Sequence, residues 1–317
     1  MQRLTRFRRR AAQERGATAV IVALLMVPML GFTAIAVDVG RVYAERAQLQ
    51  VAADAAALAV AQDCARGNCG DIQATASAMV AANETGSTAA PPVLSSAPLS
   101  VTVTGDKPTR HWFAPVLGID ATNVSATATV AWGAPGAGTA VLPLTFSWCE
   151  WNAQTGGGMP TGSTVRTIQF TKTSGTSCTG PSHLVVPGGF AYVDTDTGTC
   201  QATSAIAQVV DSDTGNTPPG SCANADFAGW LGQTVLLPLF DQSGSSGNNA
   251  WYRVYGYAAF RLTGYFFGGQ FASSPKPCSG NARCIAGYFV RFVDESDRFT
   301  YTSTGPDLGA DILRLIR

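Results

Sequence analysis

The 317 residues include as many basic as acidic side chains, 21 of each, but the two are unevenly spread. Six arginines and one glutamate lie within residues 1 to 15, so the rest of the chain is mildly acidic. Because nucleic-acid phosphates are bound by clustered Lys and Arg, we expect no nucleic-acid partner. A chain of this length has room for one or two domains outside a membrane.

Residues 17–37 carry no charged side chain. An apolar helix of about 20 residues covers the ~30 Å hydrocarbon core of a bilayer, so this run predicts a transmembrane helix. Arginine clusters stay on the cytoplasmic side of such a span. We therefore expect residues 1–16 to be a cytoplasmic basic tail, and everything after Asp38 to lie outside the cytoplasmic membrane of a single-pass protein.

Pro28 lies in the middle of this run, where the loss of one helical hydrogen bond predicts a mild bend. A cleavable secretory signal is the alternative, since Ala34-Ile35-Ala36 fits the small-residue rule for a cleavage site. The run is longer than the 7–15 residues usual for such signals, which favours the transmembrane helix.

Apolar residues continue beyond the run at helical spacing, at Val42, Leu49, Ala53, Ala56 and Val60. No Gly or Pro interrupts residues 41–66, so we expect one continuous membrane and stalk helix that ends near Gly67.

A second helix is predicted over residues 72–83, and its surface is mostly alanine. Small residues allow close approach of backbones, so this helix is a candidate surface for a homo-oligomer. The alternative is a helix that packs only on its own domain.

All cysteines lie on the predicted outer side, where disulfides persist. They are Cys64, Cys69, Cys149, Cys178, Cys200, Cys222, Cys278 and Cys284. Cys64 with Cys69, and Cys278 with Cys284, are spaced to close short loops, while the middle four allow three connectivities. A zinc site is the alternative, but no CxxC pair occurs.

Residues 38–132 are predicted to form a helical stalk plus a small α+β region. Residues 99–104 and 124–130 alternate apolar and polar side chains, as strands with one buried face do. Residues 111–118 between them predict a short helix. The Gly-rich and Pro-containing residues 133–138 are the best candidate for a domain boundary.

Residues 139–317 contain short β-branched and aromatic runs separated by turn residues, which predicts a mostly β exported domain. We expect strands at 141–148, 165–171, 190–194, 235–240, 251–267 and 286–293. The expected fold class is therefore α+β: an N-terminal transmembrane helix that continues into a helical stalk with a small α+β layer, followed by a mostly β C-terminal domain.

Several spaced elements in residues 14–62 resemble the N-terminal segment of TadE/TadG-like Flp pilus-assembly proteins. They are Glu14-Arg15-Gly16-Ala17-Thr18-Ala19-Val20, then Pro28, then Ala36-Val37-Asp38-Val39-Gly40-Arg41, and then residues 49–59. The residues that match the family motif are Gly16, Pro28, Asp38, Gly40, Arg41, Ala53, Asp54 and Ala57.

The resemblance implies a membrane-anchored component of the bacterial tight-adherence pilus machinery. Its partners would be the lipid bilayer, an assembly ATPase, and other pilus-assembly or pilin-like membrane proteins. Prepilin-type substrates place Glu five residues after the cleavage glycine, whereas Ile21 stands there in this chain. We therefore expect no processing at Gly16, and an anchored protein nearer to the TadG-like branch.

One string could hold a metal ion, namely Asp241-x-Ser243-x-Ser245 after an apolar run. Von Willebrand factor A-type domains, which occur in some TadG-like proteins, hold Mg²⁺ with such oxygen ligands. Those domains follow the string with a helix, whereas residues 251–255 predict a strand. We expect a polar hairpin loop here, and no metal or cofactor.

Catalysis by a Ser or Cys nucleophile needs a base, and the histidines are His111 and His183. No Gly-x-Ser-x-Gly elbow accompanies either. The remaining acidic candidates, expected to form solvated turns, are Asp194, Asp196, Asp211 and Asp213. We expect no enzyme activity, and an exported hydrolase ranks last among the hypotheses.

The sequence therefore predicts a structural or accessory component of a Flp/Tad-type pilus assembly system. The alternative is an envelope-anchored adhesion or binding module with no role in pilus biogenesis. Its contact surface would consist of aromatic side chains, of which the candidates are Trp148, Trp151, Trp251, Tyr252 and Phe266.

Overall fold

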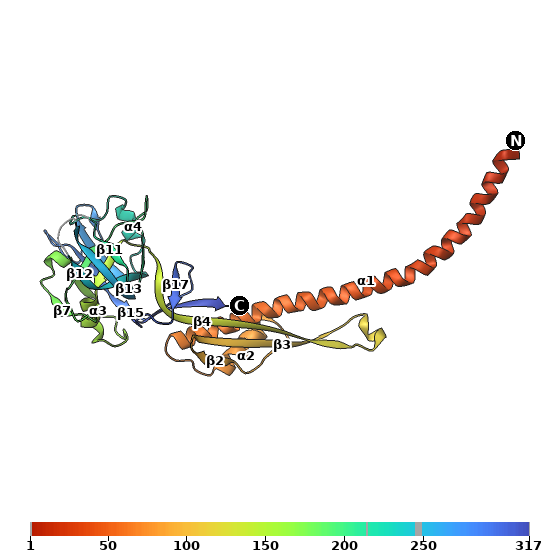
Figure 1. Ribbon diagram of the computed structural model, residues 1–317, viewed down its shortest axis with the longest axis horizontal. Coiled ribbons are helices and arrows are strands. Elements are labelled where there is room, and N and C mark those ends of the chain that lie inside the picture. Colours follow the sequence, from red (N-terminus) through yellow and green to blue (C-terminus); the bar gives the residue numbers. More distant parts are fainter. Residues whose placement is uncertain (1, 214, 245–248, 317) are drawn as a thin grey trace. The chain divides into compact units, whose positions relative to one another are not determined.

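The computed structural model describes residues 2–213, 215–244 and 249–316 (Figure 1). The helices are α1 (Gln2–Ala65), α2 (Ile72–Asn83), η1 (Ala114–Leu117), α3 (Trp148–Thr155), η2 (Thr171–Thr173) and α4 (Asn224–Ala228). The strands are β1 (Thr88–Ala89), β2 (Val93–Ser96), β3 (Leu99–Arg110), β4 (Ala121–Ala140), β5 (Leu144–Ser147), β6 (Arg166–Gln169), β7 (Ser177–Thr179), β8 (Val185–Pro187), β9 (Phe190–Tyr192), β10 (Ala202–Ala205), β11 (Val209–Asp211), β12 (Thr234–Gly244), β13 (Trp251–Gly268), β14 (Phe271–Ala272), β15 (Cys284–Val290), β16 (Phe292–Asp294), β17 (Phe299–Thr302) and β18 (Ala310–Ile316).

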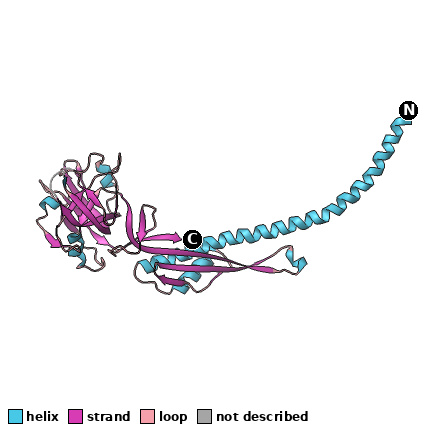
Figure 2. Cartoon of the chain, viewed as in Figure 1, coloured by secondary structure: helices cyan, strands magenta, loops and turns pink. Residues whose placement is uncertain are grey.

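The chain divides into two compact units. The first unit consists of residues up to Ala57, Gln73–Pro92 and Thr102–Ala128. The second consists of Leu58–Ile72, Val93–Val101 and the residues from Thr129 onward. Helices predominate at the start of the chain and strands after it (Figure 2), which confirms the predicted α+β class.

In the first unit, α1 and α2 pack against neighbouring strands β1, β3 and β4. The helices and the strand lie close together at Gly105 of β3. A Cβ atom added there would lie 3.0 Å from Cδ1 of Leu49 on α1 and 3.6 Å from Cγ1 of Val80 on α2. Both side chains are fully buried, so glycine at this position lets the two helices lie close to the strand.

Lys107 of β3 connects this strand to α1 and to the end of α2 by ion pairs. Its ammonium lies 2.6 Å from the carboxylate of Glu45 on α1, and it also pairs with Glu84, which follows α2. The hydrogen bonds to Glu45 and then Glu84 raise the pKa of Lys107, against partial desolvation that lowers it. The lysine therefore stays charged, and the pair of carboxylates holds β3 against both helices.

In the second unit, the main sheet has the order β6-β15-β13-β12-β5-β9, and β11 and β14 also pair with β13. Strands β12 and β5 run parallel, whereas β12 and β13 are antiparallel. The core of this unit is rich in buried aromatic side chains. Its largest members include Phe146, Phe190, Tyr192, Phe260, Phe267 and Phe289.

The glycine-rich residues 133–138, predicted as the best candidate for a domain boundary, lie inside β4. They pair with β10, β17 and β18. A Cβ atom added at Gly133 would lie 2.7 Å from the carbonyl oxygen of Thr302 on β17. Glycine is used here for close approach of another strand rather than for a turn. The predicted domain limits at 132 and 139 stay a prediction.

All cysteines form disulfides. The two short loops are closed as expected, by Cys64–Cys69 and by Cys278–Cys284. The middle four, whose connectivity the sequence left open, are paired as Cys149–Cys178 and Cys200–Cys222.

The close packing at Gly105 gives a first prediction. In Gly105→Val, the added side chain has no room beside Leu49 and Val80, and such overpacking costs about 1–3 kcal/mol. We expect a lower midpoint of thermal unfolding in detergent, followed by circular dichroism. Gly40→Ala is the control, because a Cβ at Gly40 meets nothing within 4 Å. Equal losses in both variants would contradict this packing.

Asp311 of β18 gives a second prediction, on pH. Burial and the nearby Asp307 raise the pKa of Asp311 to about 6, although Arg291 lowers it. Between about pH 4 and pH 6, the carboxyl of Asp311 is therefore protonated in the folded chain and ionised in the unfolded chain. The resulting stability is present below about pH 4 and is lost as the pH rises to about 6.

Asp311→Asn removes this dependence. Compared with the unmodified chain, the variant should gain up to about 2 kcal/mol of stability between pH 4 and pH 7, measured by thermal unfolding. Asp120→Asn, at an exposed position, is the control. A difference between Asp311→Asn and the unmodified chain that stays constant across this pH range would contradict the assignment.

Candidate functional site

The apolar part of α1 is uncovered by the rest of the chain. An 18-residue window of this helix has a mean hydropathy of 2.6 and 0% of it is buried. Within the described residues, α1 is the one helix that is long and apolar enough to cross a membrane. A bare apolar helix of this length is unfavourable in water and suits the hydrocarbon core of a bilayer. The structure thus contains a candidate single-pass membrane span.

Pro28 lies within α1 without ending it. Figure 1 shows a gentle curve in this stretch of the helix, in red and orange, and no sharp kink. This agrees with the mild bend predicted from the sequence.

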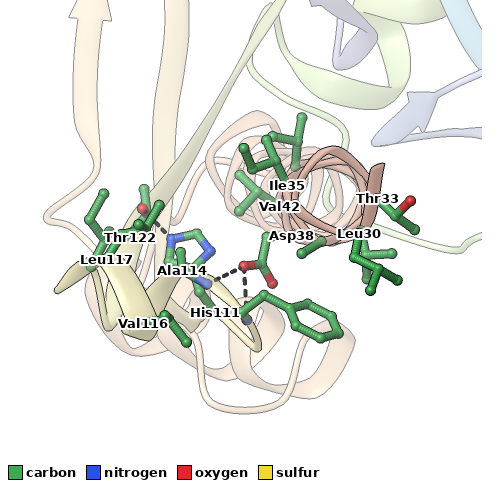
Figure 3. A pocket seen from close by; sticks show the side chains of 16 residues that line it. Leu30, Thr33, Ile35, Asp38, Val42, His111, Ala114, Val116, Leu117 and Thr122 are labelled. Carbon is green, nitrogen blue, oxygen red and sulfur yellow. Dashed lines mark hydrogen bonds between the residues drawn. The ribbon is translucent and has the colours of Figure 1, made fainter. Parts of the chain in front are cut away.

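Asp38 lies where the apolar run ends, and its side chain is 4% exposed. Its carboxylate accepts hydrogen bonds from the backbone N–H groups of Trp112, Phe113 and Ala114, at 2.8, 3.0 and 2.7 Å. Figure 3 shows Asp38 pointing from α1 toward Ala114. We call this arrangement the Asp38 clamp. It ties the loop between β3 and β4 to α1.

The local sequence explains why the loop needs the clamp. The short helix η1 has Phe113 at its N-cap, and Phe113 provides no side-chain cap. The first N–H groups of a helix have no partner within it. A carboxylate is well suited to them because it accepts several hydrogen bonds and is favoured by the helix dipole. Asp38 therefore caps η1 from a position 74 to 76 residues away in sequence.

Arg41 adds a second contact one turn along α1. Its guanidinium lies 4.8 Å from the centroid of the Trp112 ring, a cation–π distance. Arg41 also lies 3.9 Å from the carboxylate of Glu45. The two charged residues at the end of the apolar run, Asp38 and Arg41, thus both hold the same loop.

The remaining motif residues of α1 serve packing or lie exposed. Ala53 and Ala57 are fully buried. Asp54 accepts a hydrogen bond at 2.8 Å from Gln50, whose amide also donates to the carbonyl of Thr127 on β4. Gly40 has open space around it.

An apolar groove of about 1040 Å³ lies between α1 and the β3–β4 loop. The helix contributes residues between Leu30 and Val42, and the loop contributes residues between His111 and Thr122. Figure 3 shows the side chains of Leu30, Ile35 and Val42 on the helix, and Val116 and Leu117 on the loop. Asp38 is the acidic member of this set, and its other polar side chains are Thr33, His111 and Thr122.

The first half of the string Asp241-x-Ser243-x-Ser245 is part of a strand, whereas a polar hairpin loop was predicted. Asp241 and Ser243 lie in β12, and Ser245 lies outside the described residues. Asp241 is the extra residue at an irregularity in the β12–β13 pairing. It is buried, and its carboxylate lies 3.6 Å from the guanidinium of Arg253. Burial raises the pKa of Asp241, and Arg253 opposes this.

The two histidines lie on different elements. His111 contacts the hydroxyl of Thr122 at 2.8 Å across the base of the β3–β4 loop. His183 has a left-handed backbone, with a φ of 63°, in the turn before β8.

Among the aspartates, burial and the charges of Asp213 and Asp211 raise the pKa of Asp194. Asp196 accepts hydrogen bonds from the backbone and hydroxyl of Thr203. Asp194, Asp211 and Asp213 thus lie near one another, whereas Asp196 stabilises a turn.

The aromatic side chains proposed as an adhesive surface are mostly interior. Trp151, Tyr252 and Phe266 are buried. Among the described residues after α1, the exposed aromatic ones are instead Trp112 and Phe113 of the β3–β4 loop, which were predicted only as part of a short helix. The sequence feature that could have indicated this exposed loop is an apolar segment between two amphipathic strands.

One comparison with known proteins concerns α1. Residues 16–63 match the family described as "Putative Flp pilus-assembly TadE/G-like". The predicted resemblance to the TadE/TadG-like family is therefore confirmed for this part of the chain, which contains the apolar run and Asp38. The match does not distinguish the TadG-like branch. No curated protein and no solved structure shows a significant match.

The Asp38 clamp gives a third prediction. Hydrogen bonds to a charged group contribute about 1.5–3 kcal/mol each, so Asp38→Ala should accelerate amide exchange in residues 112–114 by about tenfold or more. The measurement is hydrogen-exchange mass spectrometry of the full chain in detergent micelles. Asp54→Ala, which removes a carboxylate from the same helix, is the control and should leave this peptide unchanged. Unaltered exchange in Asp38→Ala would show that the clamp does not hold the loop.

Proposed function

We propose that this protein is a membrane-anchored structural or accessory component of a bacterial Flp/Tad-type pilus assembly system, nearer to the TadG-like branch. The observation that carries the proposal is the family match over residues 16–63. That segment contains the whole uncovered apolar part of α1 after Thr18 and the two residues that hold the β3–β4 loop. The segment that matches the family is thus the same stretch of helix that contains the candidate membrane anchor.

The role we propose is mechanical rather than catalytic. In the matched segment, the charged groups Asp38 and Arg41 are engaged with the loop, and Glu45 with Lys107. These contacts fasten a folded unit to the outer end of a membrane helix. A connection of this kind would hold the first unit at a fixed place on the bilayer.

The proposed orientation has residues 1–16 in the cytoplasm and the chain after Asp38 outside it. Six arginines precede the apolar run, and such clusters stay inside. The disulfides support the same direction, because they persist in oxidising compartments. Without processing at Gly16, the arginine tail would remain attached, and burying it in a filament would be costly.

The proposed partners are the lipid bilayer and other pilus-assembly or pilin-like membrane proteins. A homo-oligomer through α2 stays a prediction. Ala76 and Val80 of this helix face the protein interior, whereas Ala74, Ala78 and Ala81 are exposed.

Deletion of the gene tests the proposal. If the protein contributes to pilus assembly, cells without it should carry few or no filaments in electron micrographs, and expression of the full chain should restore them. An adhesion module would give a different result. Filaments would remain, and only attachment to surfaces would fall, which would contradict the proposed role.

A further inference from the structure

The loop between β3 and β4 ends in a segment that is both apolar and exposed. We call residues 112–119 the hairpin tip. Its large apolar side chains are uncovered, and Val116 is 89% exposed. The others are Trp112, Phe113, Leu117 and Ile119. An apolar cluster of this size is unusual on a surface that faces water.

The tip lies beside the apolar part of α1. The Asp38 clamp fixes its first residues at the point where the apolar run ends. The groove beside its later residues is lined on α1 by residues as far back as Leu30, eight residues before Asp38. At 1.5 Å per residue, this distance is about 12 Å along the helix. If residues 17–37 span the hydrocarbon core, the tip therefore lies at the outer boundary of that core, where Asp38 holds it.

The backbone N–H groups of the tip are paired, as contact with such a region requires. Polar backbone groups cannot be left unpaired in lipid. Three N–H groups of the tip donate to Asp38. Three more, from Val116, Gly118 and Ile119, donate to carbonyls of Phe113, Pro115 and Ala114. Pro115 has no N–H, and Leu117 lies inside η1.

The polar side chains beside the tip fit the headgroup layer. Trp residues are enriched at the boundary between lipid and water, and Trp112 lies at the clamped end of the tip. Arg41 stacks on its ring, and the exposed Arg110 precedes the loop. Long basic side chains extend toward lipid headgroups from such positions.

We propose that the hairpin tip is a second lipid-contacting element, which inserts into the outer boundary of the bilayer beside α1. The lipid fills the groove between the two. The tip stops near the headgroup and acyl boundary, because irregular backbone facing lipid is not found deeper in hydrocarbon. Two attached points, one helix and one hairpin, then fix the tilt and rotation of the first unit on the membrane.

Spin labels on three matched valines test this proposal in the full chain, reconstituted alone in phosphatidylcholine vesicles. Val116→Cys reports on the tip. Val27→Cys reports on the middle of the apolar run, and Val51→Cys on an exposed position of α1 about 20 Å beyond Asp38. All three valines are exposed, so the labels disturb no packing. The native cysteines are all paired, which leaves the new thiol for labelling.

The readout is the collision rate of each label with oxygen, which concentrates in lipid, relative to a water-soluble nickel complex. We expect a several-fold higher ratio at Val116→Cys than at Val51→Cys, approaching that at Val27→Cys. A ratio at Val116→Cys equal to that at Val51→Cys would place the tip in water. Low collision rates with both reagents would mean that a second copy of the chain covers it. Either result would overturn the proposal, whatever the outcome of gene deletion.

Discussion

The Asp38 clamp resolves a problem that arises at the end of any membrane helix followed by a folded unit. A buried carboxylate at the end of the apolar run is costly unless it is hydrogen-bonded. The N–H groups at the start of η1 have no partners within that helix. Each supplies what the other lacks, since three N–H groups donate to Asp38. The position of the β3–β4 loop, the groove beside it and the exposed face of the hairpin tip all depend on this contact.

A second set of interactions holds the same unit further along α1. Lys107 pairs with carboxylates from α1 and from the end of α2. Gly105, two residues earlier on β3, lets Leu49 and Val80 approach the strand. The strand is therefore held by charge and by close packing within two residues, and the loop at its end by the clamp. These contacts hold β3 and its loop firmly against α1, which contains the candidate membrane span.

Periodicity and composition were sufficient to predict the long helix, the mostly β second part and the two short disulfide loops. They were insufficient where a residue's role depends on distant partners. The glycines of 133–138 suggested a domain boundary, and the close approach of neighbouring strands to them could not be predicted from the sequence. The Asp38 contact joins residues more than 70 positions apart, and no local pattern indicates such a pairing. For the same reason, the apolar tip was predicted only as a short helix, without its position beside α1.

The central claim is that α1 remains in the mature protein as an uncleaved membrane helix. The most direct measurement is the intact mass of the protein extracted from membranes of the cells that make it. The account predicts a mass close to the 32.9 kDa of the whole chain. A mass that lacks the residues up to Gly16 or Ala36 would contradict it, because the arginine tail, or the tail together with the span, would then be absent.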